Sequence, residues 1–211
     1  MKNIKIVNET VENDDGDTIT RFYFTTDEEN APKSRSVEIR PLAIYNKLIN
    51  MSQNEEGHWN TEGESILFRD VFKKGGGHDP IADSLGTNAL GRKFGQELAK
   101  LSPAEQKKNK DSAKWYTFIF GLFSFDGKEP VLGNIRLTGS QGLDWDPKKA
   151  LTRDLHNNLV KFTVKPNNEG MRKFVFTFES AKSAATDVDD SIQAVEDFVA
   201  EHNDNVVGAN D

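Results

Sequence analysis

Alternation of apolar and polar side chains predicts β-hairpins in three parts of the chain. The clearest turn is Asp126-Gly127, a dipeptide that tolerates the positive φ angles of a tight turn between two strands. The cleanest alternation places Val160, Phe162 and Val164 on one face, which predicts a half-buried strand. The predicted strand pairs are residues 2–7 with 18–26, 114–125 with 131–137, and 159–165 with 171–179. The pattern favours a mainly β fold.

Apolar spacings of three and four residues predict helices between the hairpins. Pro41 suits the first turn of a short helix over residues 42–49. Residues 88–101 place their apolar side chains along one side of a second helix. Ser102 and Glu105 form the capping-box pattern that starts a third, short helix. These helices are expected at the periphery of a sheet.

The end of the chain predicts an acidic amphipathic helix. Val188, Ile192 and Val195 recur at helical spacing within residues 187–204, and residues 205–211 are expected to be disordered. Such a helix docks either on its own domain or on a protein partner. Its candidate partner-binding residues are Asp187, Asp189, Asp190, Glu196, Asp197, Phe198 and Glu201.

Aromatic residues crowd the central predicted strand, residues 114–125. They are Trp115, Tyr116, Phe118, Phe120, Phe123 and Phe125. Alternation leaves both faces of this strand apolar. Such a strand is either buried on both faces or uses one face for a ligand, and flat aromatic rings are the surface on which nucleobases stack. Both alternatives stay open on the sequence alone.

Charge is distributed unevenly along the chain. The net charge is −7, of which residues 1–68 carry −6 (seven Lys/Arg against thirteen Asp/Glu), residues 69–173 carry +7 (nineteen against twelve) and residues 174–211 carry −8 (one against nine). A basic middle attracts a polyanion, whereas an acidic end competes for the same surface or recruits basic partners. The alternative interpretation is an acidic protein whose charges are simply solvated.

Lysines and arginines of the basic middle are candidate phosphate contacts. Lys73 and Lys74 precede three glycines, whose backbone can approach a phosphate closely, although a flexible connection has the same composition. Arg92 and Lys93 follow a Gly-x4-Gly spacing that lacks the Lys-Ser/Thr pair of a P-loop. The other candidates are Lys107, Lys108 and Lys110 before the aromatic strand, and Lys161, Lys165, Arg172 and Lys173 on the third hairpin.

The sequence lacks the motifs of common enzymes. It has no cysteine, and its four histidines show no metal-ligand spacing. No nucleophile elbow or dinucleotide fingerprint occurs. We therefore expect a binding protein and not an enzyme, with no cofactor and no metal. No apolar run approaches the ~20 residues that cross a bilayer, which predicts a cytoplasmic protein with no membrane partner.

Strand hairpins, an aromatic central strand, basic loops and an acidic C-terminal extension together resemble the single-stranded DNA-binding proteins of bacteriophages, which are built on the oligonucleotide-binding (OB) barrel. The resemblance covers residues 66–211. It implies an α+β, mainly β fold with a five-stranded antiparallel OB-like barrel at residues 66–180. An N-terminal hairpin and helix at residues 1–65 would pack on this barrel, and residues 181–211 would form an acidic helix and tail.

The same resemblance implies a function. Trp115, Tyr116 and Phe118 would stack on bases, while the lysines and arginines above would contact phosphates of single-stranded DNA. The protein would protect strands during replication or recombination in the host cytoplasm, and its acidic tail would bind replication or recombination proteins. A homodimer is left open. The rival interpretation is a protein-interaction module, either a virion component or an acidic DNA mimic that inhibits a host protein.

Overall fold

The computed structural model describes residues 1–56, 58–68, 99–112, 114–138, 156, 158–166, 174–182 and 187–208. The chain divides into two compact units. The first unit comprises residues 1–43 and 119–195, and the second comprises residues 44–118 and 196–211. Two strands and one helix have residues in both units, and each unit is described by itself below.

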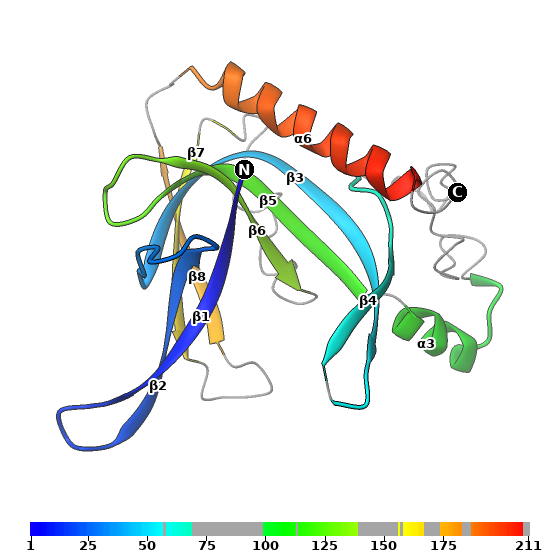
Figure 1. Cartoon of the computed structure of the whole chain (residues 1–211), viewed down its shortest axis with the longest axis horizontal. Coiled ribbons are helices and arrows are strands. Elements are labelled where there is room, and N and C mark those ends of the chain that lie inside the picture. The colour runs from blue at the N-terminus through cyan, green and yellow to red at the C-terminus, as the bar shows by residue number, and fades with distance from the viewer. Residues whose placement is uncertain are drawn as a thin grey trace. The chain divides into compact units, whose positions relative to one another are not determined.

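The described part of the chain is mainly β (Figure 1). Its strands are β1 (Lys2–Glu12), β2 (Thr18–Thr26), β3 (Ser36–Gln53), β4 (Trp59–Glu64), β5 (Lys114–Ser124), β6 (Val131–Thr138), β7 (Asn158–Pro166) and β8 (Phe174–Lys182). Its helices are α3 (Pro103–Ser112) and α6 (Asp189–Gly208). The strand order in the sheet is β2-β1-β6-β5-β3-β7-β8, and β4 pairs with β3.

In the first unit, six strands form a nearly closed, barrel-shaped sheet in the spatial order β2-β1-β6-β5-β3-β7. Closure runs through the short segment before β3. Phe24 of β2 and Ser34 exchange two backbone hydrogen bonds, with N···O distances of 2.7 and 3.0 Å. The next residue, Arg35, accepts a backbone hydrogen bond of 3.0 Å from Val164 of β7. The backbone groups of Ser34 and Arg35 thus link β2 to β7, the first and last strands of the barrel-shaped sheet.

The barrel-shaped sheet differs in composition from the five-stranded antiparallel barrel that the sequence predicted at residues 66–180. It contains β1, β2 and the start of β3, so the N-terminal residues supply barrel strands and do not pack on a separate barrel. The pairing of β1 with β6 is parallel. The predicted mainly β, barrel-like character is confirmed at this coarser level.

The first two predicted hairpin turns lie within the described residues and are present, whereas the turn predicted between residues 159–165 and 171–179 lies outside them. Asp126 and Gly127 have φ angles of 50° and 73°, as the dipeptide predicted for the turn between β5 and β6. Asp126 also accepts a hydrogen bond of 2.7 Å from the hydroxyl of Ser34, which joins this turn to the segment that closes the barrel. In the first hairpin the side chain of Asn13 accepts a backbone hydrogen bond of 2.7 Å from Asp17, so the polar turn has its own internal support.

Each strand of the barrel-shaped sheet contributes buried side chains to the core of the first unit. Its members are Ile4, Phe22, Phe24, Val37, Ile39, Ile119, Phe120, Phe123, Phe125, Ile135, Leu137, Val160, Phe162 and Val164. Two glycines let neighbouring strands approach closely at this core. A Cβ atom on Gly121 would lie 2.5 Å from the carbonyl oxygen of Arg40, and one on Gly133 would lie 2.7 Å from that of Lys2.

In the second unit, residues 44–53 belong to the long strand β3, so the helix predicted over residues 42–49 is wrong. Leu42, Ala43, Tyr45, Leu48 and Ile49 are all buried. Because both faces of the strand are covered, apolar side chains occupy odd and even positions alike, and the alternation that marks a strand is lost. The spacing of the apolar residues over residues 42–49 then fits a helix as well as a strand.

The β3–β4 hairpin continues beyond the end of β4. Asn46 and Phe68 exchange backbone hydrogen bonds of 2.7 and 2.9 Å. Between them, the backbone of Ser65 donates to Leu48 and its side chain accepts from the same residue, both at 2.9 Å. Residues 65–68 therefore extend the hairpin edge along β3.

Helix α3 begins with the cap that the sequence predicted, and helix α6 begins with an aspartate cap. At α3, the Ser102 backbone donates to the carboxylate of Glu105 at 2.8 Å, and the Glu105 backbone donates to the Ser102 hydroxyl at 3.4 Å. At α6, the side chain of Asp187 accepts from the backbone of Asp189 at 3.1 Å. The disorder expected from residue 205 onward is wrong for residues 205–208, because α6 continues to Gly208.

Candidate nucleic-acid interface

Most aromatic rings of β5 are core side chains. Tyr116, Phe120 and Phe123, together with Phe125 just after the strand, expose between 0 and 5% of their surface. Even and odd positions of the strand are both represented among these buried rings, so these residues offer no open platform. Phe118 is only half-buried. The Trp115 backbone belongs to β5, but its side chain lies outside the described residues.

Tyr116 is the clearest case in which burial bears on a predicted contact. Its ring is 5% exposed, and its hydroxyl lies 3.3 Å from the sulfur of Met51 on β3. A ring in this position has no face open to a base, so the prediction that Tyr116 stacks on nucleic acid finds no support in the fold. Of the predicted stacking residues, only Phe118 has a described side chain with partial solvent access.

The lysines of α3 are presented to solvent. Lys107 and Lys108 are exposed, as are most of the side chains described on this helix. Lys110 also belongs to α3, although its side chain lies outside the described residues. The helix ends two residues before Lys114, the exposed first residue of β5. The chain thus leads from a basic, polar helix directly into the aromatic strand.

Lys161 lies on the outer face of β7, where the structure weakens the predicted basic strip. Its side chain is exposed, while its neighbours Val160 and Phe162 point into the core. The strand register places Glu38 of β3 and Glu179 of β8 directly opposite Lys161. Cross-strand neighbours have Cβ atoms about 5 Å apart, so the exposed Glu38 borders this lysine.

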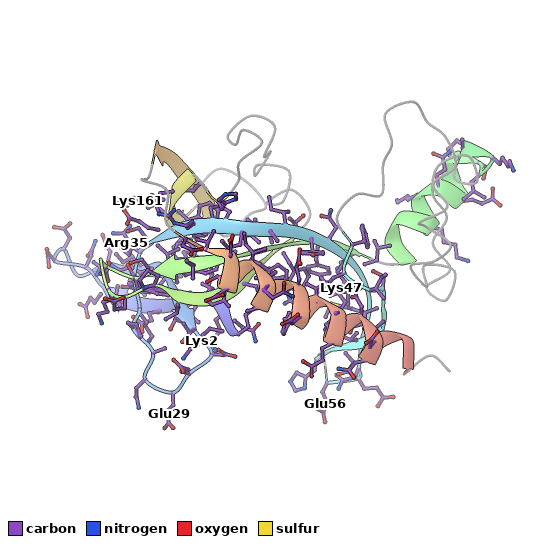
Figure 2. The ribbon with its side chains drawn as sticks, turned by 90° about the horizontal axis from the view of Figure 1, so that it is seen from above. Lys2, Glu29, Arg35, Lys47, Glu56 and Lys161 are labelled. Carbon is purple, nitrogen blue, oxygen red and sulfur yellow. The ribbon has the colours of Figure 1, made fainter. Side chains whose placement is uncertain are left out.

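Arg35 adds a second exposed cation to the same end of the β3–β7 pair, where Figure 2 labels it near Lys161. Lys165 lies farther along β7, opposite Val175, and its side chain is not described. The candidates outside the described residues are Lys73, Lys74, Arg92, Lys93, Arg172 and Lys173.

The acidic residues of α6 form an exposed face on an ordered helix. Asp187, Asp189, Asp190, Glu196, Asp197 and Glu201 are all exposed. The opposite face carries Val195, Val199 and Val206, which are buried. Phe198 is half-buried, and its ring stacks on that of His202 with centroids 6.2 Å apart. The acidic groups therefore belong to a packed helix and not to a loose tail.

A buried polar cluster that the sequence did not predict lies where the C-terminal half of α6 meets the β3–β4 hairpin. The Lys47 side chain is only 4% exposed, and its Nζ atom lies 2.8 Å from Oε2 of Glu64 and 2.5 Å from Nε2 of His202. The other carboxylate oxygen of Glu64 lies 3.9 Å from the same histidine nitrogen. One ammonium thus bridges a carboxylate and an imidazole.

The electrostatics of this cluster require a neutral imidazole. An ammonium group has donors only, so at 2.5 Å the Nε2 atom of His202 must act as the acceptor. Burial, and after it the Lys47 ammonium, lowers the pKa of His202, and the opposing effect of Glu64 is smaller. The cluster is then a buried cation paired with one anion and one neutral ring.

Asn203, the residue after this histidine, pairs with the backbone of Leu67 on the outer edge of the hairpin extension. Its side-chain oxygen accepts from the Leu67 backbone at 2.7 Å, and its side-chain nitrogen donates to the Leu67 carbonyl at 3.1 Å. A side-chain amide thereby takes the place of a neighbouring strand.

Within the described residues, no group of three or more His, Asp or Glu side chains could hold a metal ion.

Two weak sequence signals point to this cluster in retrospect. Lys47 is the one charge in the apolar run of residues 41–49, and a lone charge in such a run needs a buried partner. His202 lies on the apolar face of α6, at spacings of three and four residues from Val199 and Val206. Neither signal identifies the partner, because 155 residues separate the lysine from the histidine.

Comparison with protein-family models, curated proteins and solved structures finds no match to this chain. Among the residues that the structure describes, no helix has the length and hydrophobicity needed to span a membrane.

Proposed function

We propose that this chain binds single-stranded DNA with little sequence preference and protects the strands during phage-type replication or recombination. The observation that carries the proposal is the exposed lysine pair Lys107 and Lys108 on α3, immediately before the aromatic strand β5. Lysines that follow the phosphate backbone next to aromatic side chains are typical of single-strand binding. The role is one of binding and not of catalysis.

The distribution of charge supports the same proposal. Residues 69–173 carry a net charge of +7, although the whole chain is acidic at −7. A polyanion therefore meets a local attraction that the total charge conceals. The mainly β fold with a nearly closed six-stranded sheet suits an OB-like barrel, an architecture that other proteins use for oligonucleotides.

Within this proposal, the contacts are mainly electrostatic. Because Tyr116 is buried, we propose Phe118 and Trp115 as the aromatic residues of β5 that stack on bases. Electrostatic contacts carry no sequence information. The proposed binding is consequently sequence-tolerant and sensitive to salt.

A competition experiment tests this function. Labelled oligo-dT is bound at low salt and then displaced by unlabelled single-stranded DNA, by single-stranded RNA of the same length, or by duplex DNA. We expect single strands to compete and duplex DNA to compete poorly. If labelled oligo-dT does not bind at low salt, the proposal is wrong; equal competition by duplex DNA would point to general polyanion binding.

The ordered acidic face of α6 favours a second candidate, a protein-interaction module. Asp189, Asp190, Glu196 and Asp197 present carboxylates on a rigid helix, which is an arrangement that a basic protein surface can bind. In that case the chain is a virion component or a DNA mimic that inhibits a host protein. Retention of a basic host protein, together with no affinity for oligonucleotide, would favour this candidate over the first.

A further inference from the structure

The C-terminal half of α6 contacts the β3–β4 hairpin through two adjacent polar residues. His202 accepts from the buried Lys47 ammonium, and Asn203 pairs with the backbone of Leu67. Figure 2 labels Lys47 on β3, where this strand passes α6. The two interactions are one residue apart on the helix, so they form or break together when this part of the helix moves.

The histidine interaction exists in only one protonation state. Protonation of Nε2 removes the acceptor for Lys47 and places a second cation 2.5 Å from a buried ammonium. Among the described residues, the charged side chains recorded beside His202 are Lys47 from β3 and Glu64 from β4, and its own helix contributes the ring of Phe198. Two cations in contact in a partly buried site repel each other, which opposes protonation of His202 while it is seated against Lys47.

We propose that the C-terminal half of α6 is a pH-sensitive latch on the edge of the β3–β4 hairpin, seated while His202 is neutral and released by acidification. Release breaks the Asn203 pair and uncovers the N–H and C=O groups of Leu67. The hairpin itself stays formed, because Phe68 and Asn46 are paired through their own backbone groups. This latch is independent of any nucleic-acid role.

The exchange rate of the Leu67 amide hydrogen, measured by NMR, reports whether the latch is seated. The Leu67 N–H is bound by the Asn203 side chain, whereas the neighbouring Phe68 N–H is bound by the Asn46 backbone. Dividing each rate by that of an unstructured peptide removes the intrinsic effect of pH. We expect protection of Leu67 to fall severalfold between about pH 7.5 and about pH 5.5, the range in which histidine titrates, while Phe68 keeps its protection.

Two variants make the result specific. His202→Gln keeps a neutral acceptor for Lys47, so protection of Leu67 should no longer depend on pH. Asn203→Ala removes the partner of Leu67, so its protection should be low at both pH values. The proposal is overturned if Leu67 is equally protected at both pH values, if His202→Gln shows the same pH response, or if Phe68 loses protection in parallel.

Discussion

The Nζ atom of Lys47 lies 2.5 Å from the Nε2 atom of His202 and 2.8 Å from a carboxylate oxygen of Glu64. This relationship joins β3, β4 and α6 in one hydrogen-bonded cluster. The lysine is buried and both of its partners are half-buried. We therefore expect the stability of the protein to depend on the charge of the His202 imidazole.

The first prediction concerns the pH dependence of stability. Burial and Lys47 lower the pKa of His202 in the folded protein, so the unfolded chain binds more protons just below the ordinary histidine pKa. Stability from neutral His202 is therefore fully present above about pH 6.5 and is lost as the pH falls through the lowered folded value. Urea midpoints of wild type should fall across this range, and those of His202→Gln should fall less.

A second titrating group does not interfere with this measurement. The pKa of Asp27 is lowered from its ordinary value of 3.8, chiefly by a hydrogen bond from its own backbone. Its contribution is thus present above that value and is lost only at more acidic pH. Identical pH profiles for wild type and His202→Gln between about pH 5 and about pH 7.5 would show that the histidine contributes nothing.

The second prediction concerns Gly121 and Gly133, which lie close to neighbouring strands in the first unit. Gly121→Ala and Gly133→Ala each place a methyl group within 3 Å of a backbone carbonyl oxygen, which cannot move away without shifting a strand. Each should lower the free energy of unfolding by about 1–3 kcal/mol, as overpacking does. Chemical denaturation measures the change.

Gly127→Ala is the matched control. A Cβ atom there meets nothing within 4 Å, although the positive φ of 73° makes the position unfavourable for alanine. Its cost should be limited to about 1 kcal/mol of backbone strain. Equal costs at all three glycines would mean that strand proximity does not govern the effect.

The hairpins and caps of this fold were predictable from sequence because their signals are local. Asp126-Gly127 specifies a turn through the φ angles of two residues, and Ser102 with Glu105 specifies a helix start within one turn. The strand β7 was predictable because only one of its faces is buried, so its alternation survives. None of these features depends on a distant partner.

The parts that could not be predicted depend on partners far away in the sequence. Residues 42–49 were assigned to a helix, since burial on both faces of β3 removes the alternation that identifies a strand. Barrel closure through Ser34 and Arg35 follows from pairings with Phe24 and Val164, which no local pattern contains. The Lys47 cluster is hidden for the same reason.

The third prediction separates stacking from packing on β5. Tyr116→Ala should destabilise the fold by about 3–5 kcal/mol, because it empties a buried aromatic site. Tyr116→Phe keeps the ring and should leave oligo-dT affinity unchanged. Phe118→Ala should instead weaken binding, with a cost of about 1–3 kcal/mol if the half-buried ring contacts a base. Weaker binding by a well-folded Tyr116→Phe variant would contradict the core assignment.

The fourth prediction concerns the lysines of α3. Replacing Lys107 and Lys108 with glutamate should weaken oligo-dT binding and reduce the salt slope by about 0.7 for each lost phosphate contact. Both side chains are exposed, so the fold should tolerate the change. The control replaces two other exposed lysines, Lys5 and Lys128, with glutamate and gives the same net charge. Equal loss in both double variants would assign the effect to total charge.

The fifth prediction concerns the acidic face of α6. Asp189→Asn with Asp190→Asn removes two exposed carboxylates without altering the buried valines of the helix. If the acidic helix repels DNA, affinity for oligo-dT should rise at low salt and converge with wild type at high salt, where charges are screened. Fluorescence anisotropy at several salt concentrations measures this. Unchanged affinity at low salt would remove competition with DNA from the roles of the helix.

The salt dependence of oligo-dT binding decides whether this chain holds single-stranded DNA through the lysines of α3. Fluorescence titrations of wild type and of the Lys107→Glu, Lys108→Glu variant are compared at low and moderate salt. We predict that wild type binds at low salt, that its affinity falls steeply as salt is added, and that the variant binds more weakly with a shallower slope. Absence of wild-type binding at low salt, or binding that salt does not affect, would contradict the account.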